Sequence, residues 1–420
     1  MSFSEILRKS ALLLIDFQND FIDPPDTLAD LGIKPISGDD RIAAFRNARM
    51  LLESVRDANR PVFHVRTAFR PDLADCLFSP FWIERIGSKI PFLVEGSHGA
   101  SFVKEIAARP SDFIVTKKGH SAFQHTPLDR MLTEQNVSSC IVAGFSGVAG
   151  SVDDTVRQGA ALGYDIVLIS DASFPLDSFH SGSLRNRALI QTTMETVDEL
   201  SKVDQHAAGR ESGLRPALIV VDMQNDSIHR EGCNERLGFS HLTDAERNLI
   251  ISNNQRLSNF MREKGWPVVY VNLAHRIDLS DSASPKIVHK NKQLPSGTGR
   301  RTEGSWGAQT VAELAPQEKD YVLIKKGQSA FGFTPLHRLL RNLAINRCVV
   351  TGGAVTGCVS DTVREGAGLG YRTVVVSDAT YPPRSPYLAS LTGRAEIKTT
   401  DEVMRVLQSE EELQGRRMVA

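Results

Sequence analysis

The chain has 420 residues, of which 41% are hydrophobic and 24% are charged, a composition typical of globular proteins. Its 49 basic and 50 acidic residues give a formal net charge of -1, which disfavours a nucleic acid or an anionic membrane surface as a partner. No apolar run is long enough for a signal peptide or for the roughly 18 residues of a membrane span, so we expect a cytoplasmic protein.

The sequence repeats itself at an offset of 206 to 208 residues. In chain order the matched segments are ALLLIDFQND with ALIVVDMQND (11–20, 217–226), TKKGHSAFQHTPLDRML with IKKGQSAFGFTPLHRLL (116–132, 324–340) and SDASFP with SDATYP (170–175, 377–382). A period of this length is a whole domain rather than a solenoid unit. We therefore predict two tandem domains, 1–205 and 214–420, joined by the polar segment VDQHAAGRESGLR at 203–215.

Within each copy, short apolar runs alternate with longer helix-like stretches. The runs of the second copy are rich in Val and Ile: ALIVVD, PVVYVNL, YVLIK, RCVVT, RTVVVSD and a weaker AEIKTT. Such continuous runs indicate strands of a parallel sheet that are buried on both faces. Between the first two, residues 244–265 predict a helix that Gly265 can end, with one apolar face of Leu249, Ile250, Leu257, Phe260 and Met261. The fold class is α/β: two three-layer α/β/α domains, each with a mainly parallel, doubly wound sheet of about six strands.

Three reactive side chains follow strands of the second copy. Asp222 comes after the first strand, Lys325 ends the third, and Cys358 follows the fourth through a glycine-containing turn. Each has an ordinary structural interpretation, as a loop or helix-cap acid, a solvated strand end and a small buried hydrophobe. Ligands of parallel α/β sheets bind at the carboxyl ends of the strands, however, so their joint placement favours a site.

The motifs DMQND, KKGQSAFGFTPL and GGAVTGCVSDTVREGAGLGY, in this order, resemble the isochorismatase-like cysteine hydrolases. This superfamily includes nicotinamidases, N-carbamoylsarcosine amidases and isochorismatases, and the resemblance covers essentially all of both copies. It implies that Asp222, Lys325 and Cys358 are the catalytic residues of the second copy. Lys326 is adjacent to Lys325 and is the alternative assignment for the lysine.

The resemblance implies cleavage of a carbon-nitrogen bond, of the amide or carbamoyl type, in a small molecule. A helix N-terminus and a nearby ammonium group are expected to lower the pKa of the Cys358 thiol. Asp222 would accept the thiol proton and return it to the leaving group, while Lys325 stabilises the charged forms. A thioester on Cys358 would then be hydrolysed by water.

The turn before Cys358 is expected to hold the oxyanion of the tetrahedral intermediate through backbone N-H groups. It comprises Val355, Thr356 and Gly357, and the resemblance implies a non-proline cis peptide near Val355 and Thr356. Three further residues are candidates for substrate contact, although the two aromatic ones are equally well explained as core residues. These are Gln224, Phe331 and Trp306.

No metal and no cofactor are predicted. The five cysteines are spread too widely for a disulfide framework or a metal site. His275 and His289 lack the Asp and His spacing of the nicotinamidase metal cluster, as does His64 in the first copy, and nicotinamide is therefore disfavoured as the substrate. A nicotinamide-dependent redox enzyme is disfavoured because no GxGxxG follows either first strand.

The first copy holds Asp16, Lys117 and Ser151 in the catalytic places, and a hydroxyl is much harder to activate than a thiol. Lys118, next to Lys117, is again the alternative lysine. We expect a degenerate domain that supports the second one. Two alternatives are a ligand-binding role and acid-catalysed ether cleavage of the isochorismatase type, which needs the Asp but no Cys.

Assembly is a further expectation from the duplication. Single-domain relatives commonly form oligomers, so we expect the two copies to form an intramolecular pseudo-dimer, with further homo-oligomerisation possible. A binding module that keeps the fold but not the chemistry is the alternative to an enzyme, and it would require an inert Cys358.

Overall fold

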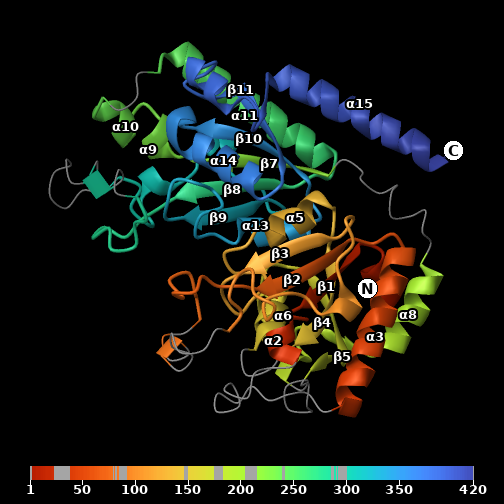
Figure 1. The fold of residues 1–420 in the computed structure, drawn as a ribbon. Coiled ribbons are helices and arrows are strands. Elements are labelled where there is room, and N and C mark those ends of the chain that lie inside the picture. Colours follow the sequence, from red (N-terminus) through yellow and green to blue (C-terminus); the bar gives the residue numbers. More distant parts are fainter. Residues whose placement is uncertain are drawn as a thin grey trace. The chain divides into compact units, whose positions relative to one another are not determined.

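The computed structural model describes residues 2–22, 38–78, 80, 83–84, 92–145, 150–174, 183–203, 215–238, 242–284, 288–289, 291 and 300–419. The chain divides into two compact units, Met1–Ser212 and Gly213–Ala420 (Figure 1). Most of the predicted linker, residues 204–214, lies outside the described residues. The domain limits 1–205 and 214–420 therefore stay predictions, as does the pseudo-dimer.

Each unit contains, among its described residues, one sheet of six parallel strands, which confirms the predicted fold class. In the first unit the order across the sheet is β3-β2-β1-β4-β5-β6. These strands are β1 (Ser10–Ile15), β2 (Val62–Thr67), β3 (Phe113–Lys117), β4 (Ser139–Phe145), β5 (Asp165–Phe174) and β6 (Leu189–Gln191). Its main helices are α3 (Gly38–Asp57), α5 (Leu128–Glu134), α6 (Ser151–Ala161) and α8 (Thr193–Lys202).

The second unit repeats this order as β9-β8-β7-β10-β11-β12. The strands are β7 (Pro216–Val221), β8 (Val268–Leu273), β9 (Tyr321–Lys325), β10 (Arg347–Gly353), β11 (Arg372–Tyr381) and β12 (Glu396–Lys398), and all six predicted apolar runs form strands. The helices used below are α9 (Asn225–Ile228), α11 (Asp244–Glu263), α13 (Leu336–Asn342), α14 (Ser360–Gly368), α15 (Thr400–Val419) and the 3-10 turn η4 (Trp306–Ala308).

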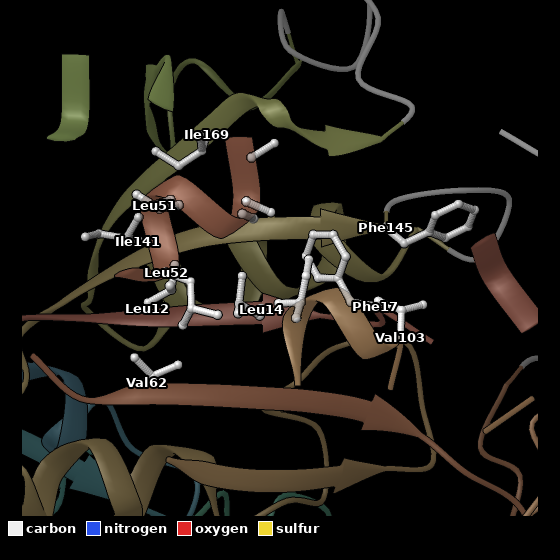
Figure 2. Close-up of a cluster of buried hydrophobic side chains, with 14 of the residues drawn as sticks. Leu12, Leu14, Phe17, Leu51, Leu52, Val62, Val103, Ile141, Phe145 and Ile169 are labelled. Atoms are coloured by element: carbon white, nitrogen blue, oxygen red, sulfur yellow. The ribbon is translucent and has the colours of Figure 1, made fainter. Parts of the chain in front are cut away.

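Alternate residues of the central strands face two different hydrophobic cores, which makes each unit a three-layer structure. In the first unit, Leu12 and Leu14 pack with Leu51 and Leu52 of α3 (Figure 2). The intervening residues of β1 pack against α5 and α6 on the opposite face. In the second unit α11 and α15 contact each other and β11 on one face (Figure 1), whereas α13 and α14 cover the other.

The helix predicted at 244–265 is α11, and its ends follow from the sequence. The Thr243 side chain caps its first turn in a capping box with Glu246, and Gly265 leaves it with a φ of +68°. Ile250, Leu257 and Met261 are buried as predicted, whereas Leu249 is 36% exposed and does not belong to the apolar face. No helix in the described ranges is long and apolar enough to cross a membrane.

Candidate active site

The structure brings Asp222, Lys325 and Cys358 together at the carboxyl ends of β7, β9 and β10. Asp222 directly follows β7, where its φ of +51° turns the chain sharply, a conformation that Asp tolerates better than most residues. Its Oδ2 lies 3.1 Å from Nζ of Lys325, and both side chains are fully buried. The Cys358 thiol and the Asp222 carboxylate lie close enough for each to shift the pKa of the other. The three side chains thus form one buried cluster.

The lysine of the cluster is Lys325 and not its neighbour. The Lys325 ammonium also donates to the backbone carbonyls of Gly327 and Gln328, at 3.1 and 2.8 Å, so three acceptors surround it. Lys326 points the other way and pairs with Asp281 and Glu303. The alternation of side chains along a strand separates the two lysines.

The electrostatics of the cluster favour a protonated thiol beside an ionised carboxylate. Burial and the charge of Asp222 raise the pKa of Cys358 above its ordinary value, although Lys325 and Arg301 act in the opposite direction. For Asp222 burial raises the pKa, but the charges of Lys325 and Arg301 outweigh it and the pKa is lowered. The prediction of a lowered thiol pKa is therefore wrong for the resting protein, because burial and the carboxylate outweigh the ammonium group.

The turn that carries Cys358 is a single π-helical turn, Val355–Val359, between β10 and α14. Val355 is buried in the core, Thr356 is exposed, and the Gly357 N-H already donates to the Ala354 carbonyl at 3.0 Å. The predicted non-proline cis peptide is present, and it is the Gly353-Ala354 bond, directly before Val355.

The end of β10 leaves no room for a side chain at Gly353. A Cβ atom on Gly353 would lie 1.9 Å from the ring of Tyr381 on the neighbouring strand β11, so only glycine fits this position.

Sequence reasoning missed two arginines that adjoin the cluster. Nη1 of Arg301 lies 3.4 Å from Oδ2 of Asp222, and its Nη2 donates to the hydroxyl of Ser227 on α9. Arg300, the preceding residue, is 7% exposed, and its charge acts on Asp222 and Cys358. Burial and the neighbouring Arg301 lower the pKa of Arg300 to about 10.

A loop contact explains how the arginines reach the site from a segment without regular structure. The backbone N-H of Arg301 donates to Asp226 at 2.6 Å, and His275 and Arg301 are joined by a hydrogen bond of 3.0 Å between backbone groups. Tyr381, whose pKa is raised by burial, interacts with Ser227 and with the charge of Arg301. The sequence signal for these two residues was the dipeptide Arg300-Arg301, in a loop whose sequence differs between the two copies.

The three candidates for substrate contact each make other contacts within the protein. Gln224 is fully buried and donates to the carbonyls of Leu273 and Ala308, while its oxygen accepts from the Leu273 N-H. Phe331 stacks on Tyr371 in the core, at 5.7 Å between ring centroids. Trp306 is 46% exposed, and its ring contacts His229. The side chain of Gln224 is therefore held by the backbone and that of Phe331 by the core, whereas Trp306 is partly exposed beside His229.

The first unit keeps the acid and the lysine in the same arrangement. Nζ of Lys117 lies 3.0 Å from Oδ2 of Asp16 and donates to the hydroxyls of Ser151 and Thr67, at 3.1 and 2.7 Å. Thr67 in turn donates to Oδ1 of Asp16 at 3.0 Å. Burial lowers the pKa of Lys117. Lys118 pairs with Asp75 outside the cluster, so Lys117 is the equivalent of Lys325.

The first unit differs in what surrounds this pair. Its Leu93 N-H donates to Asp20 at 2.7 Å, the same contact that Arg301 makes with Asp226, so Phe92 and Leu93 stand where the second unit has its arginines. Phe21 stands in the place of Ser227, and its ring centroid lies 5.4 Å from Phe92 and 4.9 Å from Phe145. Phe145 belongs to the apolar cluster of Figure 2 and ends β4, as Gly353 ends β10. In the first unit, apolar side chains therefore stand in place of polar ones that surround the second site.

Neither unit offers a metal site in the part of the chain described above, where no three His, Cys, Asp or Glu side chains are grouped closely enough. His275 is buried beside Lys326, Arg301 and Lys325. Burial and these cationic neighbours lower the pKa of His275 to about 4. The charge of Asp281 acts in the opposite direction but is outweighed.

Known proteins resemble this chain in sequence and in structure. The isochorismatase domain family matches residues 10–199 and 216–391. The ureidoacrylate amidohydrolase RutB of Cronobacter turicensis is 34% identical over 180 residues, covering 41% of this chain and 76% of the relative, and RutB of Klebsiella pneumoniae is 35% identical over 179 residues, covering 39% and 72%. Among solved structures, the N-carbamoylsarcosine amidase of Thermoplasma acidophilum is 30% identical, with a TM-score of 0.37, and covers 45% of this chain and 98% of its own.

Proposed function

Because the chain belongs to the isochorismatase family, we propose that its second unit hydrolyses a carbon-nitrogen bond, of the amide or carbamoyl type, in a small molecule through a thioester on Cys358. The observation that carries this proposal is the buried contact of the Cys358 thiol with a carboxylate that Lys325 keeps ionised. The relatives named amidohydrolase and amidase support the bond type.

The reaction begins with a proton transfer that the raised thiol pKa makes necessary. Asp222 takes the proton from Cys358 as the sulfur attacks the substrate carbonyl carbon, so the thiolate exists only when it is used. The tetrahedral intermediate collapses with cleavage of the carbon-nitrogen bond, and Asp222 returns the proton to the departing nitrogen. Water then attacks the thioester, Asp222 accepts its proton, and the released thiol is protonated again.

The oxyanion of both tetrahedral intermediates is held by the turn before α14. Since the Gly357 N-H already donates to Ala354, we assign the oxyanion to the backbone N-H groups of Thr356 and Cys358. Lys325 keeps the Asp222 carboxylate in place, and Arg301 binds its Oδ2 from the other side. Both cations act on the substrate through Asp222.

For the first unit we propose a degenerate site without hydrolytic activity. Ser151 donates no proton to Asp16 in this arrangement, because Lys117 and Thr67 hold the carboxylate and Lys117 also binds the Ser151 hydroxyl. Phenylalanines stand beside it where the second unit has polar groups, which disfavours a substrate of the second unit's kind. Ether cleavage with Asp16 as the acid and ligand binding without chemistry are the alternatives.

A substrate panel tests these assignments. Primary amides, carbamoyl compounds and biuret-like ureides are offered to the wild-type chain and to the variants Cys358→Ala, Ser151→Ala and Asp16→Asn. We expect turnover of at least one class, a loss of about 10⁴-fold or more in Cys358→Ala, and unchanged rates in the other two. Turnover that survives Cys358→Ala but fails in Asp16→Asn would transfer the activity to the first unit.

Two further expectations are carried as proposals. A cytoplasmic location is supported by the five cysteines, each of which is a free thiol.

The intramolecular pseudo-dimer is tested by cleaving the linker between residues 203 and 215 and separating the units. Full activity of the isolated second unit would contradict it.

A further inference from the structure

Three side chains of the second unit are polar where the first unit has a row of aromatic rings. In the first unit the rings of Phe69 and Phe78 lie 5.2 Å apart between centroids, edge to face, and Phe78 stacks on His120 at 4.1 Å. The corresponding residues of the second unit, which we call the polar row, are His275, Ser284 and Gln328.

Backbone contacts establish this correspondence. His275 and Phe69 donate their backbone N-H groups to equivalent loop carbonyls, at 3.0 and 2.8 Å. The residues directly before Ser284 and Phe78 donate theirs to the carbonyl of the second lysine in each KKG motif, at 2.9 and 2.8 Å. The third pair of residues directly follows the glycine of that motif. The polar row and the aromatic rings therefore occupy the same places in the two units.

Gln328 lies at the end of the polar row that adjoins the nucleophile. A Cβ atom on Gly357, the residue before Cys358, would lie 3.0 Å from Oε1 of Gln328. The backbone carbonyl of Gln328 accepts from Nζ of Lys325 at 2.8 Å, so the lysine of the cluster fixes its place. Its Nε2 donates to the Ser284 hydroxyl at 3.4 Å, whereas Oε1 accepts no hydrogen bond from any residue in the described ranges. An acceptor oxygen is thus open beside the thiol.

His275 forms the inner end of the polar row. It is 1% exposed, and the charges of Lys325 and Arg301 act on it, yet neither ring nitrogen has a hydrogen-bond partner among the described residues. Because its pKa is lowered to about 4, the ring is neutral near pH 7 and offers one donor and one acceptor. Oδ1 of Asp222 is likewise buried without a partner in the described part of the chain. Buried polar atoms of this kind are commonly bonded to ordered water.

We propose that the polar row holds the water that hydrolyses the thioester on Cys358, and that Gln328 positions it. The water donates one hydrogen bond to Oε1 of Gln328 and one to Asp222, which leaves a lone pair free to attack the thioester carbon. Asp222 takes the proton as the carbon-oxygen bond forms, and the sulfur receives it when the carbon-sulfur bond breaks. His275 and Ser284 hold the water that replaces the consumed molecule. This inference rests on the proposed function, of which it explains the second half-reaction.

Competition between water and a thiol for the thioester isolates this half-reaction. The full chain turns over a substrate from the panel in the presence of 2-mercaptoethanol, whose thiolate needs neither a base nor an ordered water. Initial rates of hydrolysis and of thiol transfer are compared. Gln328→Leu should lower the ratio of hydrolysis to transfer by about 10- to 100-fold, because a misplaced reacting group loses rate on this scale. An unchanged ratio would overturn the proposal.

The value of kcat/KM separates positioning of the water from support of the fold, because it reports the steps up to the thioester. It should stay within a few-fold in Gln328→Leu. A lowered kcat/KM with an unchanged ratio would assign Gln328 to structure or to substrate binding, and would contradict the proposal. Gln328→Met, which keeps the length of the side chain, provides the same test if the leucine variant does not fold.

Three matched variants sharpen the assignment. Gln328→Glu keeps an acceptor oxygen and should retain a ratio of hydrolysis to transfer within a few-fold of the wild type. His275→Phe, which copies the first unit, should lower the ratio several-fold, and an unchanged ratio would contradict its part in the polar row. Gln255→Leu is the control for the substitution itself, because Gln255 lies on α11 and donates to the Glu313 carbonyl. It should leave the ratio unchanged.

A crystal structure of the full chain provides a readout that does not depend on turnover. We expect one ordered water within hydrogen-bond distance of both Oε1 of Gln328 and Asp222, and another at a ring nitrogen of His275. Absence of both waters would contradict the proposal. If the waters are present but no compound acylates Cys358, the proposed function fails and the role in hydrolysis fails with it. If acylation occurs but the ratio does not depend on Gln328, the proposed function stands and this inference fails.

Discussion

The two units have the same sheet order and the same buried acid-lysine pair, yet they differ at several polar positions around it. Asp16 and Lys117 lie 3.0 Å apart, and Asp222 and Lys325 lie 3.1 Å apart. The comparison teaches that the fold accommodates this pair beside either a thiol or a hydroxyl. Once both charges are buried, removal of either leaves the other unpaired, so the fold keeps the pair even where the nucleophile is gone.

What distinguishes the units is a coordinated set of substitutions. Where the second unit has a serine, two arginines and a glycine, the first has Phe21, Phe92, Leu93 and Phe145, which pack together. Each exchange alone would leave a buried polar group without a partner or a clash, whereas together they make a continuous apolar cluster. The first site has therefore become part of a hydrophobic core.

We expect the largest effect on turnover when the nucleophile residues of the two units are exchanged. Cys358→Ser should lower the turnover of the second unit by about 10⁴-fold, because a carboxylate base cannot activate a hydroxyl as it activates a thiol. Ser151→Cys should create no measurable activity, because apolar side chains of the first unit replace the two arginines and the serine that adjoin the second cluster. Turnover assays of the Cys358→Ala/Ser151→Cys double variant check this, and recovered activity there would contradict a degenerate first unit.

Removal of the lysines should destabilise both units but inactivate only one. Lys117→Met and Lys325→Met each break a buried ion pair and leave the carboxylate with a weaker partner, Thr67 for Asp16 and Arg301 for Asp222, which should cost about 3 kcal/mol in the free energy of unfolding of the unit concerned. Urea denaturation measures the loss, and activity should disappear only in Lys325→Met. Asp16→Leu combined with Lys117→Met is the control, since an apolar pair should restore most of the stability. Loss of activity in that control would show that the first unit takes part in the reaction.

The stability of the second unit should depend on pH through His275. Its pKa is lowered to about 4, whereas the unfolded chain binds a proton near pH 6.5, so stability should fall as the pH drops from about 6.5 to 4. The contribution is at most about 3 kcal/mol. His275→Phe, which copies Phe69 of the first unit, should flatten this part of the stability profile. The denaturation midpoints of the wild type and of His275→Phe are measured between pH 7 and 4. Parallel pH profiles for the wild type and the variant would contradict the assignment to His275.

The smallest effect is expected at Lys326, the neighbour of the catalytic lysine. Its partners Asp281 and Glu303 are partly exposed, so Lys326→Ala should cost less than about 1 kcal/mol of stability and leave turnover unchanged. Lys118→Ala in the first unit is the matched control. A loss of turnover comparable to that of Lys325→Met would show that the lysine was assigned wrongly.

Much of the fold could be predicted from the sequence because the runs of Val and Ile and the repeat are local signals. The motifs also have a local physical reason: the Thr362 hydroxyl of DTVR accepts the N-H of Ala330 in SAF, and Thr155 and Ala122 repeat this contact in the first unit. Asp222, Lys325 and Cys358 come together because each follows a parallel strand of one sheet.

The remaining parts of the site depend on contacts that no local pattern encodes. Arg300 and Arg301 reach the cluster through a backbone hydrogen bond to His275, some 25 residues earlier in the chain. Gln224 looked like a ligand because it is polar and follows a strand, but the backbone of two loops uses its whole side chain. The direction of the shift in the Cys358 pKa depends on burial, which residue spacing does not reveal.

Trapping of the covalent intermediate tests the central claim, a single site built on Cys358, most directly. The wild-type chain is quenched with acid during turnover of a substrate from the panel, digested, and its peptides are weighed by mass spectrometry. The account predicts an acyl adduct on the peptide that contains Cys358 and none on the peptide that contains Ser151. An adduct on Ser151, or sustained turnover by Cys358→Ala, would contradict it.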